Sequence, residues 1–413
     1  MAILPDKNPH CLIVGAGIAG LATAISLAQR NIRVTIVEKR DNFLEEGAGI
    51  QLGPNATRCL SQLGVTTYLR ENIIAPNSLI LSNLKSGDIV NKLPLGRVIR
   101  DKFSSPYWLI KRKHLHLALL EQAKTLNLIS LNMSCRLIDY QEHSNGYAVL
   151  CGNNQKQQDE FSVHAIIGAD GVYSDFRAKT LPRKKPRFSG FIAWRGTIEK
   201  RDIPKAFQKR QVQLAFGNGC HFVGYPVQSG ELYNCVLVTK NRLKNYQPEG
   251  MISPDQLLNK IGRIAPNFKS LISCCPKWTG WPLYAHLNLS LKDFEAFNAQ
   301  TLIGDAAHPV LPFLAQGAAL SLEDAVVLGA SIDQQNEEDL PAKAFFTSAF
   351  RSYEQKRLAR WKQVAKAAKN NHIPYHLYWP FSEVRDLILS LQPSYNLLKK
   401  YDWLYGFKAE EEA

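Results

Sequence analysis

Several features that would place this chain in a membrane or metal-binding class are missing from its sequence. No window approaches the run of about 20 apolar residues that a bilayer span requires. The N-terminal stretch MAILPDKNPH lacks the basic segment and apolar run of an export signal. The eight cysteines include no CxxC pair, so neither a zinc site nor a disulfide framework is expected. We therefore expect a cytoplasmic protein without a membrane span or metal site, whose thiols are reduced and mostly buried.

The charge distribution and the length indicate which partners and how many domains to expect. The formal net charge is +14 at pH 7, but the one dense basic run, RKKPR at 183–187, has no interleaved aromatic residues. We interpret this run as a solvated loop and expect no nucleic-acid partner. The positive excess either favours anionic ligands or reflects the average composition of the host's proteins. The 413 residues are enough for two domains, and the hydrophobic fraction of 45% is that of a soluble globular protein.

The first motif with chemical content is a glycine-rich turn near the N-terminus. Residues 11–14 (CLIV) read as a strand, and Gly15, Gly17 and Gly20 then form a GxGxxG pattern in front of a run with helical periodicity. The first glycine allows a tight turn, the second lets the backbone approach a pyrophosphate, and the third allows close packing of helix and strand. The N-terminus of the helix then faces the phosphates.

An acidic residue completes this dinucleotide-binding pattern. Residues 33–37 (RVTIV) read as the next strand, and Glu38 at its end is placed to accept hydrogen bonds from an adenosine ribose. Ala16, Ala19 and Lys39, which lie within or beside the pattern, are predicted to contact the same ligand. The pattern predicts a bound dinucleotide but does not distinguish NAD from FAD.

Two later segments repeat the order of strand, acid and helix. One is VHAIIGADGVYSDFR (163–177), where a strand is followed by Asp170 and Gly171. The other is TLIGDAAHPVLPFLAQGAALSLEDA (301–325), where a strand leads to Asp305 and a helix begins only after two prolines. A soluble dehydrogenase that binds NAD has no need of such a unit so far along the chain.

Together with the glycine-rich turn, these segments resemble the three flavin-site segments of the FAD-dependent aromatic hydroxylases, the single-component flavoprotein monooxygenases. The similarity runs from about residue 10 to residue 407 and is nearest to the salicylate hydroxylase-like branch. Other segments that carry it are GAGIQLGPNATRCLSQLG (47–64), IKRKHLHLALL (110–120), FIAWRGTI (191–198), HFVGYPVQSGELYN (221–234) and WLYGF (403–407).

The resemblance implies an α/β fold with a discontinuous, Rossmann-like FAD-binding domain, an inserted β-sheet-rich substrate domain and a C-terminal helical region. Alternating strand-like runs at 190–198, 211–217 and 231–239 agree with the inserted sheet. The AEEEA end is expected to fray. The predicted limits are 1–75, 108–182 and 290–345 for the FAD domain, 76–107 and 183–289 for the substrate domain, and 346–413 for the helical region.

The resemblance also gives roles to the segment that contains the two prolines. Asp305, expected at the end of a strand over 301–304, accepts hydrogen bonds from ribityl hydroxyls. Pro309 and Pro312 fix φ near −65° and keep the backbone extended beside a flat ring. The alternative is a tight loop that holds no ligand.

The helix that follows is expected to begin near Gln316 and to point its positive dipole end at the flavin. The free N–H groups of Gly317 and Ala318 lie at that end, where they stabilise the anionic pyrimidine edge of a reduced flavin.

Two further positions are assigned to the flavin through the family likeness. Arg112, at the start of a helix whose leucines 115, 117, 119 and 120 lie on or near its buried side, is expected to reach the phosphates or the ribityl chain. A surface salt bridge is the alternative for this arginine. Gly49 is expected to let the backbone approach the isoalloxazine ring, and Gly47 is an alternative for this role.

The candidate catalytic residues are His221, Tyr225 and Pro312. Positions i and i+4 of a strand share a face, so His221 and Tyr225 are expected to line one wall. The ordinary pKa of histidine, about 6.5, suits a base that takes a proton from a phenol in a pocket that stabilises the phenolate. The alternative for His221 is a structural hydrogen bond at a sheet edge. For His308, beside a proline, we favour a structural role over catalysis.

The substrate pocket is expected to be mostly apolar. Arg195 is a candidate partner for a substrate carboxylate unless its strand places it outward, and Phe313 is a candidate wall together with Leu311 and Leu314.

The resemblance implies the chemistry of the reaction as well. NADH or NADPH, visiting without a binding domain of its own, reduces FAD, and O2 then adds to give a hydroperoxide that attacks a small aromatic substrate. The substrate class is salicylate-, hydroxybenzoate- or hydroxypyridine-like, and the protein is expected to be a monomer or a homodimer. The alternatives are a related flavoprotein epoxidase or dehydrogenase, and a flavin-binding module without turnover.

Overall fold

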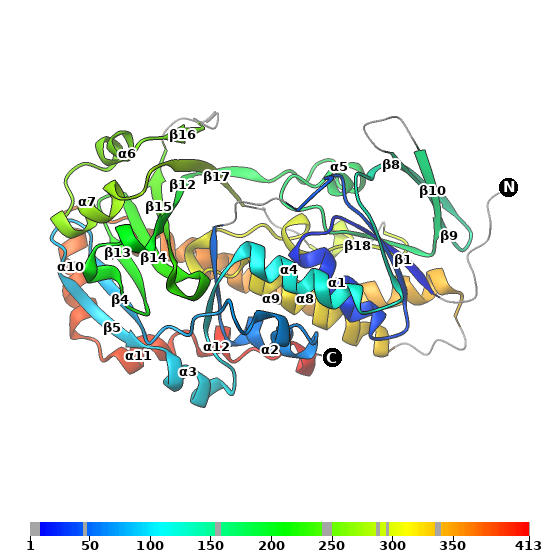
Figure 1. Cartoon of the computed structure of the whole chain (residues 1–413). Helices are drawn as coiled ribbons and strands as arrows, with labels where there is room; N and C mark the ends of the chain where they lie inside the picture. Colours follow the sequence, from blue (N-terminus) through cyan, green and yellow to red (C-terminus); the bar gives the residue numbers. More distant parts are fainter. Residues whose placement is uncertain are drawn as a thin grey trace.

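The computed structural model describes residues 9–43, 48–152, 158–241, 250–285, 290–294, 297–334 and 340–412. Figure 1 shows two large sheets at opposite ends of an elongated molecule, with long helices running through the middle. The sheet on the right of the view contains the N-terminal strand, and the sheet on the left is formed mostly by the middle of the chain. The predicted α/β fold, with a Rossmann-like part, a β-rich part and a helical C-terminal part, is confirmed.

A five-stranded parallel sheet, ordered β18-β11-β1-β2-β7, forms the first half. Short, apolar runs of this kind suit parallel strands that are buried on both faces. The strands predicted at 11–14 and 33–37 are confirmed. The strands are β1 (His10–Val14), β2 (Arg33–Val37), β7 (Ile129–Asn132), β11 (Ala165–Gly168) and β18 (Gln300–Leu302).

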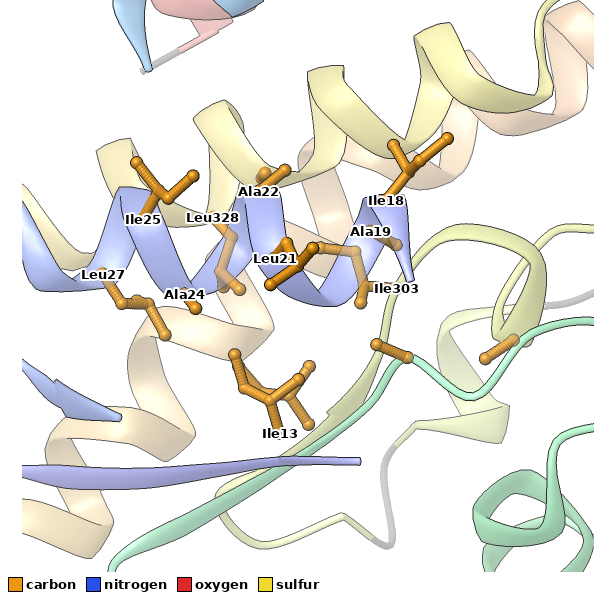
Figure 2. Close-up of a cluster of buried hydrophobic side chains, with 14 of the residues drawn as sticks. Ile13, Ile18, Ala19, Leu21, Ala22, Ala24, Ile25, Leu27, Ile303 and Leu328 are labelled. Carbon is orange, nitrogen blue, oxygen red and sulfur yellow. The ribbon is translucent and has the colours of Figure 1, made fainter. Parts of the chain in front are cut away.

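Helices pack on this sheet and on one another around one large apolar core. Figure 2 shows Leu21 and Leu27 on the side of the first helix that faces Ile13 of β1, and Ile18 and Ile25 on the opposite side. All eleven residues of that helix are buried, so it is a core helix rather than a surface one. The helices of this half are α1 (Ile18–Ala28), α2 (Pro54–Gln62), α4 (Arg112–Lys124), α5 (Asp175–Thr180), α8 (Gly317–Asp333) and α9 (Ala342–Tyr375).

An eight-stranded sheet, ordered β16-β17-β12-β15-β14-β13-β4-β5, forms the second half. Its pairings are antiparallel except for β13 with β4. The strand runs predicted at 190–198, 211–217 and 231–239 all belong to it. The strands are β4 (Ser78–Asn83), β5 (Ile89–Pro94), β12 (Arg187–Glu199), β13 (Gln211–Phe216), β14 (Cys220–Val227), β15 (Leu232–Lys240), β16 (Met251–Ile252) and β17 (Trp278–Ala285).

The two faces of the eight-stranded sheet have different partners. On β14, Cys220 and Phe222 pack in a core with α6 (Pro254–Ile261) and α7 (Pro266–Ser273). Tyr225 and Val227 lie on the other face, which packs against the rest of the molecule. The alternation along the strand therefore directs one set of side chains outward to α6 and α7, and the other set toward the centre of the protein.

Smaller elements complete the fold. A two-stranded sheet pairs β3 (Gly49–Leu52) with β6 (Trp108–Lys111). A three-stranded sheet of β8 (Arg136–His143), β9 (Gly146–Gly152) and β10 (Gln158–Val163) lies at the end of the first half, on the right of Figure 1. The remaining helices are α3 (Gly96–Phe103), α10 (Phe381–Leu391), α11 (Ser394–Lys399) and α12 (Asp402–Tyr405). Short 3-10 turns are Thr66–Leu69, Lys200–Asp202, Lys205–Phe207, Gln228–Gly230, Leu291–Asp293, Gly304–Ala306, Pro312–Leu314 and Ala409–Glu412.

The segment with the two prolines differs from the prediction at its first end. The strand predicted over 301–304 is Gln300–Leu302, and Asp305 lies in a 3-10 turn instead of at the strand end. The reason is Gly304, whose φ of +60° is incompatible with a strand and whose N–H donates to the Asp324 carboxylate at 3.1 Å. Pro312 likewise starts a 3-10 turn, so the backbone there is not extended.

The C-terminal region joins the core of the first half. The helix predicted there is confirmed as α9, and its predicted face, Phe346, Phe350, Tyr353, Leu358 and Trp361, is buried. The expectation that the chain end frays is wrong for the part described, because Ala409 is buried and Glu410 lies 3.9 Å from Arg58. The residue limits of the three predicted regions remain a prediction.

The predicted burial of the cysteines is confirmed, and the predicted burial of the α4 leucines is confirmed at all but one position. Seven of the eight cysteines are buried and Cys274 is half-buried, with all eight as free thiols. Leu117 is an exception to the buried leucine face of α4, since it is 36% exposed.

Among the described residues, no helix combines the length and apolar character needed to cross a membrane, and no cluster of metal-binding side chains occurs.

Candidate flavin and substrate site

The GxGxxG turn has the geometry that its three glycines predict. Gly15 has a φ of +105°, and a Cβ placed there would lie 2.8 Å from the Ala169 carbonyl oxygen of the neighbouring segment. A Cβ on Gly20 would lie 1.9 Å from the Gly15 carbonyl oxygen, so helix and turn touch. A Cβ on Gly17 would meet nothing within 4 Å among the described residues. The turn is therefore crowded behind and open in front, where a phosphate would sit.

A hollow opens beside this turn. Glu38 closes one side, with its carboxylate accepting hydrogen bonds from the N–H groups of Ala16 at 2.9 Å and Arg40 at 3.0 Å. Glu38 follows the last residue of β2, which is the position where an acidic side chain binds the ribose in a dinucleotide-binding fold. The lining residues are Ala16, Gly17, Glu38, Arg40, Phe43, Arg112, Lys113 and His116. Lys39 is exposed and does not line the hollow, and Ala19 is buried within α1.

Four of these lining residues were not identified from the sequence: Arg40, Phe43, Lys113 and His116. His116 lies one turn after Arg112 on α4, and its Nε2 lies 2.7 Å from the Ala16 carbonyl oxygen. Because a carbonyl oxygen only accepts, this Nε2 carries the proton. The spacing of four residues between Arg112 and His116 was the available signal, since such residues share one face of a helix.

The second flavin segment is tied to the third by a buried arginine. Arg177 donates hydrogen bonds to the carbonyl oxygens of Ala306 at 2.6 Å and Asp305 at 3.3 Å. Asp170 accepts the N–H of Phe176 through Oδ2 at 3.0 Å, whereas its buried Oδ1 has no hydrogen-bond partner among the described residues. Burial also raises the pKa of Asp170. An orphaned buried carboxylate oxygen calls for a donor from a ligand or water.

Asp305 lies beside the start of α8. Its side chain is exposed, but the nearby protein atoms raise its pKa by partial desolvation, and the charges of His308, Arg112 and Arg177 oppose that rise. A Cβ placed on Gly317, the first residue of α8, would lie 4.0 Å from Asp305 Oδ1. Asp305 is therefore close both to Arg112 and to the N-terminus of α8. The N–H groups of Gly317 and Ala318 belong to that terminus.

A buried ionic network supports this loop from behind. Arg357 of α9 donates to Glu323 at 2.9 Å and to Asp324 at 2.7 Å, and Arg360 donates to Glu323 at 2.9 Å. Asp324 also forms a short hydrogen bond with His308 Nε2. The positive charges of the two arginines lower the pKa of Glu323, and His308 and Arg357 lower that of Asp324 to about 2, against the effect of burial. His308 is thus fixed to α8 by a carboxylate.

Gly49 lies where the two halves meet. Its N–H donates to Asn234 Oδ1 of β15 at 2.6 Å, and a Cβ on Gly49 would lie 2.6 Å from the Tyr225 ring. Neighbouring Arg112 donates its N–H to the Ala48 carbonyl oxygen at 3.1 Å. Only a glycine fits between these side chains. Gly47, the alternative, lies outside the described residues, and Asn234 had no signal in the sequence.

His221 and Tyr225 lie on the face of β14 that turns toward the centre. The His221 ring centroid is 5.3 Å from that of Phe313, which comes from the segment between Asp305 and α8. Burial and the nearby His376 hold the pKa of His221 well below its usual value, so the imidazole is neutral at pH 7 and is a weaker base than a histidine with the ordinary pKa. Burial raises the pKa of Tyr225, which therefore remains a phenol. A neutral imidazole and a phenol are thus available on one wall.

Arg195 is placed inward rather than outward. On β12 it shares a face with Phe191 and Ala193, which pack with Phe313, while the intervening Trp194 packs with α6 and α7. Its guanidinium lies 5.5 Å from the centre of the Trp281 ring, and its charge acts to lower the pKa of Tyr225. Arg195, Tyr225, His221 and Phe313 are therefore brought to the same side of the eight-stranded sheet.

The described residues fit an FAD molecule in three respects. Space is open in front of Gly17, Asp170 has an unsatisfied buried oxygen, and Asp305 lies next to the N-terminus of a helix that is 17 residues long. These features occur on three segments that are far apart in the sequence but joined through Gly15 and Arg177.

Comparison with known proteins agrees with this geometry. Residues 9–368 match a protein family described as "FAD binding domain". The 3-hydroxybenzoate 6-hydroxylase of Polaromonas naphthalenivorans is 30% identical over 402 residues, covering 96% of this chain and 95% of that protein.

Solved structures show the same fold. A salicylate hydroxylase in a substrate complex superposes with a TM-score of 0.79 at 21% identity, covering 99% of this chain and 98% of the other. Klebsiella pneumoniae HpxO complexed with FAD and uric acid gives 0.79 at 21% identity, covering 97% of each chain. Together with the family match over most of the sequence, these findings show that the chain belongs to the FAD-dependent aromatic hydroxylases, a family of flavoprotein monooxygenases with FAD as cofactor.

Proposed function

We propose that this protein hydroxylates a small aromatic ring that carries a hydroxyl group, using NADH or NADPH and O2. The observation that carries the proposal is the position of His221. This buried, neutral imidazole lies against Phe313, on the segment that leads from Asp305 to the N-terminus of α8. A base at that place suits a phenolic substrate. The name of the Polaromonas relative, a 3-hydroxybenzoate hydroxylase, supports the hydroxybenzoate class, with salicylate- and hydroxypyridine-like rings as its near neighbours in chemistry.

Residues of the first half hold the cofactor in this proposal. FAD, when bound, supplies the transfer of electrons from the nicotinamide to oxygen. The turn at Gly15, Gly17 and Gly20 receives the pyrophosphate, with Glu38 toward the ribose. Gly171 follows Asp170 with a φ of +81°, and a Cβ there would meet no described residue within 4 Å, so the backbone can approach the ligand at this point. Asp305 accepts hydrogen bonds from the ribityl chain.

The N-terminus of α8 acts on the ring end of the cofactor. Its free N–H groups at Gly317 and Ala318 and its positive dipole end stabilise negative charge. Pro312 and Phe313, immediately before this helix, form the wall between cofactor and substrate, and Phe313 excludes water because it is buried. A site closed in this way strengthens every electrostatic contact inside it.

Residues of the second half bind and activate the substrate. His221 accepts the proton of the substrate hydroxyl, which places negative charge on the ring and makes a ring carbon electron-rich. Tyr225, kept as a phenol, donates a hydrogen bond to the resulting oxygen anion. Arg195 pairs with a carboxylate when the ring carries one, since a guanidinium matches that group with two hydrogen bonds. We propose Gly49 as the point where backbone meets the cofactor ring.

The test is a panel of hydroxybenzoates and hydroxypyridines, in which substrate-dependent oxidation of NADH or NADPH is measured together with the product. In ¹⁸O₂, a hydroxylated product carries the label, whereas a dehydrogenase product does not. Product mass and ring position then separate hydroxylation from epoxidation. Protein that binds FAD but oxidises no nicotinamide with any ring of the panel would contradict the proposal.

A further inference from the structure

His376 has a buried position next to the candidate base. It follows α9 directly and is 8% exposed. Its ring stacks on Phe191 at a centroid distance of 4.9 Å and an angle of 24°, and it meets Phe313 edge-on at 5.6 Å. Its Nε2 lies 2.9 Å from Nδ1 of His221. Packing on both sides therefore fixes the plane of the His376 ring, and one of its nitrogen atoms points at His221.

The other nitrogen atom of His376 decides which way the hydrogen bonds run. Nδ1 lies 2.9 Å from the backbone carbonyl oxygen of His372, one helical turn earlier. A carbonyl oxygen only accepts, so Nδ1 of His376 carries the proton. In a neutral ring the second nitrogen is then a bare acceptor. It follows that Nδ1 of His221 is the donor in the contact between the two rings, and that Nε2 of His221 is left without a proton.

The charges around the pair keep both rings neutral. Burial, together with the nearby charges of His372, Lys240 and Arg385, lowers the pKa of His376 to about 4, although the His372 carbonyl acts in the opposite direction. Burial and then His376 lower the pKa of His221. Tyr375, whose ring centroid lies 5.1 Å from that of His221, has its own pKa raised by burial and is an uncharged neighbour. The order of donors and acceptors therefore holds throughout the neutral pH range.

The free nitrogen of His221 is the one that a base needs. The hydrogen bond of its ring to another described residue is made through Nδ1, and none is made through Nε2. In the opposite tautomer, Nε2 would carry the proton and could only donate to a substrate hydroxyl. The contact with His376 removes that tautomer, because it would leave two bare nitrogen atoms 2.9 Å apart in a buried place.

We propose that His376 is a positioning residue that fixes His221 in the tautomer whose Nε2 accepts the proton of the substrate hydroxyl. The proposal rests on the function proposed above, in which His221 is the base. In the proton transfer the O–H bond of the substrate breaks and an N–H bond forms at Nε2, giving an oxygen anion and an imidazolium. His376 does not carry the proton onward, since its far nitrogen faces a carbonyl. The proton returns to the ring oxygen when the product hydroxyl is restored.

Two substitutions separate the hydrogen bond from the packing. His376→Phe keeps a ring against Phe191 but removes the acceptor. His376→Gln can keep the acceptor, because its amide oxygen can take the N–H of His221 while its NH2 group faces the His372 carbonyl. Tyr375→Phe is the matched control: it removes a hydroxyl that interacts with Asn371 and leaves the two histidines unchanged.

The first measurement uses no substrate. ¹⁵N-histidine NMR of the FAD-loaded protein at pH 7.5 reports which ring nitrogen carries the proton, and the His221 signals are assigned by their loss in His221→Ala. We expect the Nδ1–H form in the wild type, His376→Gln and Tyr375→Phe, and a mixture of both forms in His376→Phe. A wild-type signal from the Nε2–H form would overturn the proposal, and this result does not depend on whether His376→Phe folds.

The second measurement is the rate of hydroxylation of the best ring in the panel as a function of pH. We expect His376→Phe to lower kcat by about 10-fold or more with little change in KM, since positioned proton transfer contributes on the order of 10² to 10⁴. We expect His376→Gln to recover most of the rate and Tyr375→Phe to retain it. An unchanged kcat in His376→Phe would overturn the positioning role. Normal hydroxylation by His221→Ala would overturn the base assignment beneath it, independently of the NMR result.

Discussion

The two sides of the candidate site differ in whether backbone groups or side chains form them. The cofactor side consists largely of backbone: three glycines in a turn, the N–H groups at the start of α8, and loops held by Arg177. The substrate side consists of side chains from strands, such as His221, Arg195 and Tyr225, that come together only through the sheet. Backbone sites leave a signature in consecutive residues, whereas side-chain sites depend on which strands become neighbours.

The largest expected effect comes from removing the charge that supports the cofactor side. Arg357→Met leaves the buried carboxylates of Glu323 and Asp324 with one arginine fewer. We expect the free energy of unfolding to fall by about 3–5 kcal/mol, since breaking a buried ion pair leaves an uncompensated charge. Urea unfolding of the FAD-loaded protein measures it.

Lys124→Met is the control for an exposed ion pair. Lys124 and Glu121 are both exposed and lie 2.8 Å apart on α4, so the loss of this pair should cost less than about 1 kcal/mol. Equal losses in the two variants would show that the network under α8 adds nothing beyond an ordinary surface pair.

The next prediction compares one variant on the substrate side with one on the cofactor side, through their rate of hydroxylation and their FAD content. We expect His221→Ala to lower kcat for hydroxylation by about 100-fold or more, because a positioned base contributes on the order of 10² to 10⁴. FAD content, read from the visible spectrum, should stay at the wild-type level, since His221 belongs to the substrate side. Asp305→Ala should do the reverse and release FAD during purification. A colourless His221→Ala protein or a fully loaded Asp305→Ala protein would remove the distinction.

A smaller effect tests how much of the cofactor side is backbone. Gly20→Ala places a methyl group 1.9 Å from the Gly15 carbonyl oxygen, and we expect it to lower the free energy of unfolding by about 1–3 kcal/mol. Gly17→Ala meets nothing within 4 Å among the described residues, so unfolding of its FAD-free form should be unchanged while FAD affinity falls. Isothermal titration with FAD and urea unfolding distinguish the two. Identical behaviour of both variants would contradict the assigned roles.

The smallest effect is a pH dependence inside the cofactor half. Burial raises the pKa of Glu354 from 4.5 to about 8. Its neutral form is therefore favoured in the folded protein, and stability that is complete below pH 4.5 is lost as the pH rises through 8. Glu354→Gln removes this titration and can keep the hydrogen bond from Thr301.

We expect the variant to be more stable relative to the wild type at pH 9 than at pH 5, because only the wild type must ionise a buried carboxyl group at the higher pH. Urea unfolding at the two pH values measures this change. A difference between variant and wild type that stays constant across this range would show that Glu354 titrates normally.

The sequence predicted the cofactor side in more detail than the substrate side. Residues 33–37, the beginning of α8 and the buried face of α9 were predicted correctly because periodicity and glycine spacing are local properties. The strand over 301–304 was predicted too long because the left-handed φ of Gly304 is set by its contact with Asp324, which is distant in sequence. His376 was missed for the same reason, since 155 residues separate it from His221.

Helix α9 connects both sides through its length. It has 34 residues, so at about 1.5 Å per residue it extends for about 50 Å. Its early turns are packed in the core of the first half, and its last turn delivers His376 to His221. The length of the helix therefore sets the position of His376 relative to the first half. Deleting one residue between Trp361 and His376 would shift the far end by about 1.5 Å and rotate it by about 100°, turning the imidazole away from its partner without altering a single residue of the pocket.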